Sequence, residues 1–430
     1  MSREKELFMK RIYSVLALLF VLVFIASACT PQHNYGDITV KSTDESIFEA
    51  VSEKDVSKDE NELIGVWCNY YELSMKESKG GTAEQFREKV REMFTVSQKA
   101  GINTVFVQVR PFCDAFYKSA LFPWSEYITG EQGKDPGYDP LEIMIEEARK
   151  LNLQIHGWIN PYRVSYKTDI NTLSENNPAR KMYKEDPNSV YISDSGIFLN
   201  PANEKAKKLV IDGVKELLDY DIDGIHMDDY FYPGNDEKID KKDYEEYKKS
   251  GGNLTLAQWR RNQVSALVGM IYSQIKSENS DMVFGISPMG DIEKNYNSIY
   301  ADLELWCTKG GYVDYIMPQL YYGFENETLP FEKTAKDWEE LVSKGGKVKI
   351  YAGLALYKCG LEDKYAGGES EKKDTGRYEW INHNDIISRQ INAVRELDYS
   401  GVVFYSYKSI ANTAGNEHLK AEIEKIMGIL

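Results

Sequence analysis

The strongest constraint on the fold is a regular alternation of short apolar runs with helical segments, which begins at Glu62. Each run is rich in β-branched or aromatic residues, and each following segment repeats its apolar residues at helical spacing. The runs are 63–69, 103–110, 154–161, 223–228, 283–288, 313–322, 349–358 and 401–407. The helical segments are 82–100, 140–151, 203–220, 255–278, 301–309, 331–344, 384–397 and 418–427. This order predicts an α/β fold, a (β/α)8 TIM barrel.

The loop lengths favour the same architecture. The loops after the second, third, fourth and seventh runs are long, whereas those leading from a helix into a strand are short. In a TIM barrel the loops that follow the strands form the C-terminal face, where active sites lie. Polar or aromatic residues stand at these strand ends: Arg110, Asn160, Asp228, Ser287, Gln319, Tyr357 and Tyr405. We therefore expect a lined pocket on that face. A doubly wound sheet is the alternative, but the chain has neither a GxGxxG nor a P-loop sequence.

The N-terminal residues predict export and attachment to a membrane. A basic stretch precedes the apolar run 12–25, and Ala26-Ser27-Ala28-Cys29 follows it. This order is typical of a lipoprotein signal peptide, with 1–28 removed and Cys29 lipidated. The polar, acidic residues 29–61 are expected to form a disordered tether, and 62–430 the barrel domain. An uncleaved anchor helix is the alternative. Both place the domain outside the cytoplasmic membrane, lipid-anchored to the bacterial cell in the first case.

Composition excludes some partners. The net charge of −16 argues against nucleic acid or an anionic membrane surface, so membrane contact is expected through the N-terminal lipid only. The 30 Tyr and 7 Trp suit a carbohydrate site, although many will serve the core of a large domain. Cys68, Cys113, Cys307 and Cys359 show no C-x-x-C spacing, so no zinc or redox motif is predicted. A Cys68–Cys113 disulfide is the one pairing that we consider. No cofactor and no metal is expected.

The run 223–233 carries the main functional signal. It ends in Asp228 and Asp229, and three aromatic residues follow. Because side chains alternate along a strand, Asp228 shares a phase with Gly224 and His226 and is predicted to face the barrel axis. Asp229 either enters the site where the strand ends or holds the following loop. Carboxylates beside flat rings suit a pocket that binds and hydrolyses sugars.

Glycoside hydrolysis normally needs two carboxyl groups, so a partner for Asp228 must be found. The candidates besides Asp229 are Asp291, Glu325 and Asp114, and an ordinary solvated loop charge is the alternative for each. The catalytic prediction comprises Asp228, Asp229 and Asp291. His226 is expected either to bind Asp228 or to be satisfied inside the barrel.

The remaining polar and aromatic residues at the strand ends are predicted to bind substrate. Arg110 and Arg163 can hold a carboxylate, with structural ion pairing as the alternative. Asn160 and Gln319 can exchange hydrogen bonds with sugar hydroxyls. The residues predicted to stack on sugar rings, with core packing as the alternative, are Trp67, Trp158, Tyr230, Tyr232, Tyr321 and Tyr405.

Nine sequence blocks resemble the bacterial glycosyl hydrolase-like 10 family. They are GVW (65–67), NTVFVQVRP (103–111), LFPWSEYITG (121–130), PGYDPLEIMIEEA (136–148), HGWINPYRV (156–164), DGIHMDDYFYP (223–233), WRRNQ (259–263), FGISPMG (284–290) and VDYIMPQLYY (313–322). The resemblance implies a secreted or lipid-anchored TIM-barrel glycosidase, and one branch of the family looks like a peptidoglycan glycan hydrolase.

Together these observations predict an extracytoplasmic, lipid-anchored glycoside hydrolase that uses carboxylate acid/base catalysis. Its expected substrate is a bacterial cell-wall or surface glycan, with the peptidoglycan glycan strand favoured. The alternative is a non-catalytic glycan-binding lipoprotein. A metal-dependent deacetylase or an esterase is disfavoured, because the five histidines show no H-x-x-H pair and no G-x-S-x-G sequence occurs.

Overall fold

The computed structural model describes residues 62–367 and 375–430. The predictions for the signal peptide 1–28, the tether 29–61 and the lipidated Cys29 lie outside the described residues.

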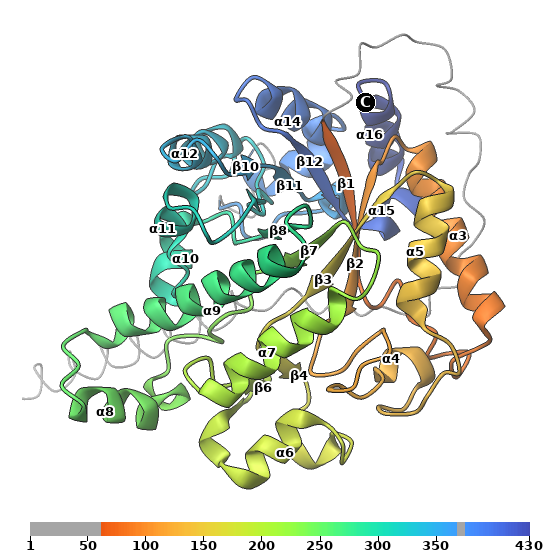
Figure 1. Cartoon of the computed structure of the whole chain (residues 1–430). Helices are drawn as coiled ribbons and strands as arrows, with labels where there is room; N and C mark the ends of the chain where they lie inside the picture. The colour runs from red at the N-terminus through yellow and green to blue at the C-terminus, as the bar shows by residue number, and fades with distance from the viewer. Residues whose placement is uncertain (1–61, 368–374) are drawn as a thin grey trace, which may run out of the picture. The chain divides into compact units, whose positions relative to one another are not determined.

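The predicted (β/α)8 barrel is confirmed (Figure 1). Its strands pair in parallel in the order β10-β9-β8-β7-β3-β2-β1-β12-β11. Only Tyr351 separates β10 from β11; β10 pairs with β9 and β11 pairs with β12. These two strands therefore form the seventh of eight barrel positions, and the sheet closes through them. The bounds are β1 Leu63–Cys68, β2 Thr104–Arg110, β3 Gln154–Ile159, β7 Gly224–Met227, β8 Val283–Ile286, β9 Tyr315–Ile316, β10 Lys349–Ile350, β11 Ala352–Leu354 and β12 Gly401–Tyr405.

All eight predicted helical segments are present, with their ends displaced by a few residues. Their starts follow local capping chemistry: Thr82 and Gln85 form a capping box on the first helix, and Asp139 caps the second, whose first residue is Pro140. The bounds are α3 Ala83–Lys99, α5 Pro140–Lys150, α7 Glu204–Leu217, α9 Leu256–Glu278, α11 Leu303–Thr308, α12 Phe331–Ser343, α14 Ile386–Arg395 and α16 Glu417–Met427.

The long loops that follow the strands hold short elements that sequence periodicity did not predict. An antiparallel sheet of order β4-β6-β5 and the helix α6 lie between β3 and α7. Figure 1 shows α4, α6, β4 and β6 gathered at one end of the molecule, at the bottom of the view. The bounds are α4 Glu126–Thr129, β4 Arg163–Ser165, α6 Pro178–Glu185, β5 Val190–Ser193, β6 Gly196–Leu199, α8 Lys241–Lys249, α10 Ile292–Ser298, α13 Glu379–Asn382 and α15 Tyr407–Ala411.

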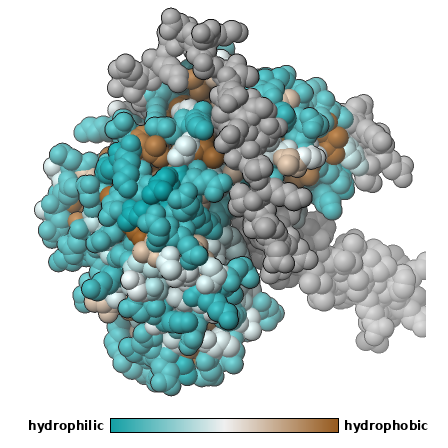
Figure 2. All heavy atoms as spheres, turned by 90° about the vertical axis from the view of Figure 1, so that its right-hand side faces the viewer, coloured by the Kyte–Doolittle hydropathy of each residue, from teal (hydrophilic) through white to brown (hydrophobic). Residues whose placement is uncertain are grey.

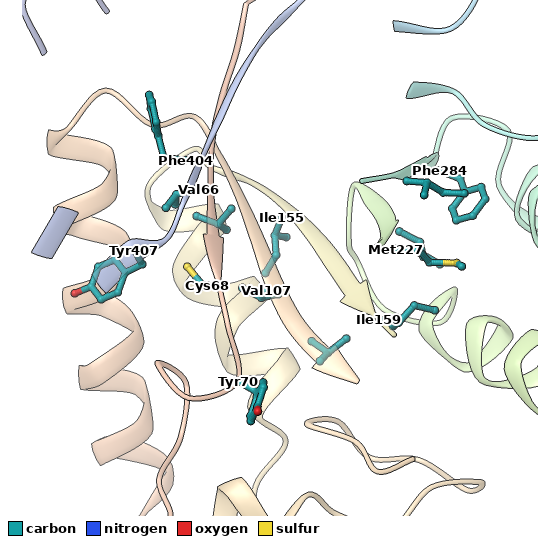
Figure 3. Packing of buried hydrophobic residues seen from close by; sticks show 14 of the residues in the cluster. Val66, Cys68, Tyr70, Val107, Ile155, Ile159, Met227, Phe284, Phe404 and Tyr407 are labelled. Atoms are coloured by element: carbon teal, nitrogen blue, oxygen red, sulfur yellow. The ribbon is translucent and has the colours of Figure 1, made fainter. Parts of the chain in front are cut away.

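Side-chain alternation divides the strand residues into two apolar layers. Ile225 and Met227 of β7 belong to the layer under the helices, together with the residues shown in Figure 3. The layer inside the barrel contains Trp67, Phe106, Trp158, Tyr315, Met317, Tyr351 and Val403. Glycines make room for its large rings: a Cβ on Gly224 would lie 2.7 Å from the His156 ring, and one on Gly285 would lie 2.1 Å from the Tyr315 ring. The predicted phase of β7 is thus confirmed up to Met227.

A buried ion pair fixes the long loop after β7. The guanidinium of Arg260, on α9, binds Asp240 through two hydrogen bonds, with Nη2 2.6 Å from Oδ1 and Nε 2.9 Å from Oδ2. Both side chains are fully buried. Breaking such a pair strands a buried charge, so the contact holds the loop that leaves the end of β7.

Cys68, Cys113, Cys307 and Cys359 are buried and free, so the Cys68–Cys113 disulfide is not formed.

On the face that carries α3 and α5, hydrophilic side chains predominate where the surface is visible (Figure 2). Within 62–367 and 375–430, no helix combines the length and the apolar character needed to cross a bilayer.

Candidate active site

Asp228 lies at the mouth of the barrel, directly after the end of β7, and only 4% of its surface is exposed. The indole N–H of Trp158, on β3, donates a hydrogen bond to its Oδ2 at 3.2 Å. Its Oδ1 has no hydrogen-bond partner among the described residues. Burial, and then the neighbouring charge of Asp229, raise the pKa of Asp228 well above the ordinary value, whereas Arg163 and Trp158 oppose this rise. Asp228 is therefore suited to carry a proton.

Asp229 belongs to the same site. Strand β7 ends at Met227, so alternation no longer sends neighbouring side chains to opposite faces. Gln319, which follows β9, places its Nε2 3.5 Å from Asp229 Oδ1. Burial raises the pKa of Asp229 to about 6, opposed by hydrogen bonds and by the charges of Lys294 and Arg163. Asp228 is the more deeply buried of the two, and this burial favours its protonated form over that of Asp229.

The guanidinium of Arg163 sits among aromatic rings beside the two aspartates. Its Cζ lies 3.7 Å from the ring centre of Tyr166, 4.5 Å from that of Tyr230 and 5.2 Å from that of Phe112. The side chain is 7% exposed, and its charge lowers the pKa of both aspartates. Cation–π contacts of this kind hold a guanidinium in place without neutralising it. Arg163 therefore supplies positive charge next to the carboxyl pair.

His226 serves the barrel interior rather than Asp228. Its Nε2 accepts a hydrogen bond from Trp67 Nε1 at 3.1 Å, so the proton of the neutral ring is on Nδ1, 3.0 Å from the hydroxyl of Tyr315. That hydroxyl lies 3.3 Å from His156 Nδ1 and can donate to it. Burial lowers the pKa of His226 well below the ordinary value. The alternative of a histidine satisfied within the barrel is the one that the structure supports, and Trp67 packs in the same cluster.

Three neighbouring strands present buried polar atoms that have no hydrogen-bond partner within 62–367 and 375–430. Besides Asp228 Oδ1 after β7, these are Asn160 Nδ2 after β3 and Ser287 Oγ after β8. Asn160 is fixed by Gln108 of β2, whose Nε2 donates to its Oδ1 at 3.2 Å. Unsatisfied buried polar groups are costly, and their convergence at one barrel mouth indicates a site that ligand groups or water complete.

Aromatic residues at the ends of β9, β11 and β12 line another part of the barrel mouth. The ring centres of Tyr321 and Tyr405 are 6.1 Å apart, and each lies edge-on to Tyr357 at 6.1 and 5.9 Å. Tyr405 also contacts Trp67 at 6.0 Å. Burial, then Tyr405 and Tyr357, raise the pKa of the half-buried Tyr321, and the negative charges of Asp229 and Asp228 add to this rise. Tyr321 is therefore close to the aspartate pair. Tyr405 packs between Tyr321 and Trp67 of the barrel interior.

Other predicted site residues have structural roles. Asp291 caps α10, accepting from the Lys294 amide at 2.9 Å. Arg110 points toward α7: its Nη1 lies so close to Gly213 of that helix that a Cβ there would meet it. Its Cζ lies 4.8 Å from the ring of Phe122, in the loop after β2. Glu325 is exposed to solvent. Tyr232 is buried, and its hydroxyl donates a hydrogen bond to Asp240 at 2.9 Å. Burial, and then the charges of Asp291 and Asp229, raise the pKa of Tyr322, so Asp291 lies near the aspartate pair and its catalytic role stays a prediction.

Two site residues were not predicted. Gln108 lies in phase with Phe106 on β2, so the alternation used for β7 would have indicated that it faces the barrel axis. Tyr166 follows the short strand β4, and no periodicity marks it. The carboxyl pair, the cation and the aromatic residues thus lie together at the mouth of a (β/α)8 barrel, the face on which TIM-barrel enzymes carry their active sites.

The family model described as glycosyl hydrolase-like 10 matches residues 62–366, and the chain belongs to this family. It is 38% identical over 323 residues to glycosyl hydrolase YngK of Bacillus subtilis, covering 70% of this chain and 62% of that protein. It is 36% identical over 295 residues to glycosyl hydrolase DigH of Escherichia coli K12, covering 62% of this chain and 65% of that protein. The chain thus spans less than two thirds of the length of these relatives.

Among solved structures, an endo-1,4-beta-mannanase from Rhizomucor miehei is similar over 82% of this chain and 87% of its own. The TM-score is 0.49 and the sequence identity is 11%. A likeness at this level does not bear on the substrate.

Proposed function

We propose that the protein hydrolyses glycosidic bonds in a glycan by acid/base catalysis, with Asp228 and Asp229 as its carboxyl groups. One observation carries the proposal. Two adjacent carboxyl groups with raised and unequal pKa values lie at the mouth of a barrel whose family is glycosyl hydrolase-like. Active sites of TIM-barrel enzymes lie on this face, and unequal pKa values separate the acid from the base.

Asp228 is the general acid. Its raised pKa favours the protonated form, which can donate the proton to the leaving-group oxygen as the glycosidic bond breaks. The Trp158 N–H then stabilises the carboxylate that is left behind. Both effects require Asp228 to be shielded from bulk water, as its burial provides.

Asp229 is the ionised partner. With a pKa of about 6 it carries negative charge at neutral pH and can stabilise the positive charge that develops on the sugar ring, or activate water. Gln319 holds it from β9. The positive charge of Arg163 favours this ionised state.

We propose a bacterial cell-wall or surface glycan as substrate, with the peptidoglycan glycan strand favoured, and a lipid-anchored location outside the cytoplasmic membrane. The family membership and the N-terminal segment with Cys29 support this part of the proposal. A net charge of −16 is compatible with a weakly charged polysaccharide and disfavours polyanions.

The test compares the protein with an Asp228→Asn variant on purified peptidoglycan glycan strands and on common polysaccharides. New reducing ends from the wild type alone support hydrolysis. Equal binding of the strands by both proteins, with no reducing ends from either, would support the non-catalytic glycan-binding alternative. Asp221→Asn is a matched control, because Asp221 precedes the same strand and its side chain is 82% exposed.

A further inference from the structure

A cavity of about 80 Å³ lies between the loop that follows β2 and the segment that contains β4, next to residues that contact Arg163. Its lining includes Phe112, Asp114, Tyr127, Gln132, Tyr166 and Leu173. A single water needs roughly 10–15 Å³ of this kind of volume, so there is room for several waters or for a sugar substituent such as an acetamido or hydroxymethyl group. The catalytic mechanism proposed above makes no use of this cavity.

Asp114 is one of the polar residues that line the cavity. It is 1% exposed, and its Oδ1 has no hydrogen-bond partner among the described residues. Its Oδ2 accepts from Gln132 Nε2 at 3.0 Å, and Gln132 is itself fixed by the amide of Ser174 at 3.0 Å. Burial raises the pKa of Asp114 to about 7, opposed by hydrogen bonds from Gln132, Ser125 and the Glu126 backbone, so near neutral pH the carboxyl group can both donate and accept. A buried group with an unused oxygen needs a ligand atom or a water to satisfy it.

The cavity shares a wall with the catalytic site. Phe112 and Tyr166 line the cavity, and both rings also contact the Arg163 guanidinium, at 5.2 and 3.7 Å. Arg163 contacts Tyr230, the residue after Asp229, at 4.5 Å. A glycan bound at the aspartates could therefore continue past Tyr230 and Arg163 into the cavity. Tyr166 is 40% exposed, so its ring is accessible at this end.

The charges around the cavity favour a neutral ligand. Lys167 lines it, but its Nζ is paired with Glu126 Oε2 at 2.9 Å. The cation that an anionic group would need is therefore already engaged. A hydroxyl or amide group can instead satisfy Asp114, while apolar sugar faces suit Phe112 and Tyr166.

We propose that this cavity is a distal sugar subsite, which binds a neutral hydroxyl- or acetamido-bearing unit of the same glycan strand through Asp114. The inference rests on the proposed function for the identity of the ligand. Asp114 lies outside the catalytic pair, so its role is to bind and position the strand. Its contribution is confined to substrates long enough to reach the cavity.

The experiment measures kcat/KM for glycan oligosaccharides of graded length, from disaccharide to octasaccharide, prepared from peptidoglycan glycan strands. In the wild type kcat/KM is expected to rise with length. For Asp114→Leu, kcat/KM on the long substrates is expected to fall about tenfold, the effect of losing one well-placed hydrogen bond. On the shortest substrate that is cleaved, its kcat/KM should equal that of the wild type. Asp114→Asn keeps a polar group there and should retain most of the increment. Asp135→Asn is the matched control, since Asp135 is an exposed aspartate of the same loop.

Thermal unfolding shows whether Asp114→Leu is folded. If it is not, Gln132→Leu replaces it, because Gln132 lines the cavity and donates to Asp114, and the same length-dependent loss is expected. A loss equal at all lengths, or a wild type without length dependence, would overturn the subsite. If no oligosaccharide is cleaved, the proposed function fails, and binding is then measured by calorimetry with the same oligosaccharides. Affinity that rises with length and falls in the variant supports the subsite even so, whereas unchanged affinity overturns it.

Discussion

The Trp158 indole N–H donates to Asp228 Oδ2 at 3.2 Å, joining the third barrel strand to the end of the fourth. An indole N–H can only donate, so the contact favours the ionised form of Asp228 over the protonated form. It therefore opposes the rise in pKa that burial causes. The proton affinity of Asp228 thus depends on this contact between neighbouring strands, besides its burial and the charges of Asp229 and Arg163.

Trp158→Phe removes this donor while keeping an aromatic ring. We expect the pKa of Asp228 to rise further, so the alkaline limb of the kcat/KM profile should move to higher pH. The activity at the optimum should fall about fivefold, because the carboxylate formed in the transition state loses a hydrogen bond. A pH–rate profile on glycan strands checks both. An alkaline limb that stays in place would show that Trp158 does not affect the pKa of the catalytic acid.

Asp228→Asn removes the proton donor without changing side-chain size. Activity should fall about 100-fold or more, within the usual contribution of a general acid. The fold should persist, because a buried ionisable group is replaced by a neutral one. Reducing-end release and thermal unfolding together check this. Activity close to that of the Asp221→Asn control would assign the acid elsewhere.

Asp229 sets the acidic limb of the pH profile. Its carboxyl group must be ionised, so kcat/KM should fall as the pH drops through about 6, the pKa of Asp229. Arg163→Met removes a charge that lowers this pKa, so the limb should move to higher pH. Arg163→Lys keeps the charge and should shift the limb less. A limb that is the same in both variants would show that Arg163 does not act through Asp229.

Asp114 makes the stability of the fold depend on pH. Its pKa is raised from 3.8 to about 7 in the folded protein, so the folded state holds a proton that the unfolded state has lost between these values. Its stabilising effect is complete below about pH 4 and is lost as the pH rises through 7. Asp114→Asn does not titrate, so its melting temperature should gain about 3 °C on the wild type between pH 5 and pH 8. Calorimetry at the two pH values measures this difference. A constant difference would place the titration on another group.

Much of the barrel followed from local patterns. The alternation on β7 put Gly224 and His226 inside and Ile225 and Met227 under the helices, and each strand–helix pair was visible as its own periodic segment. The elements that were not predicted, such as β4 and α6, are short and come from polar stretches without clear periodicity. Their pairing and packing partners are distant in the sequence.

The candidate site was predicted less completely. Sequence identified Asp228 but left its partner open, and strand alternation argued against Asp229. The structure shows that β7 ends before either aspartate, and that Gln319 from β9 reaches Asp229. Asp291, which spacing could not distinguish from the other candidates, caps α10, and its catalytic role stays a prediction.

The sequence alone therefore determined the eightfold architecture and the strand that carries the carboxyl groups, because both depend on the periodicity of neighbouring residues. The tertiary structure decided which charges meet. Arg163, Trp158 and Gln319 lie on separate segments, and only closure of the barrel brings them to the aspartate pair. The pKa values of the two aspartates depend on their burial and on their distances from these three side chains. Neither is encoded in the spacing along the chain.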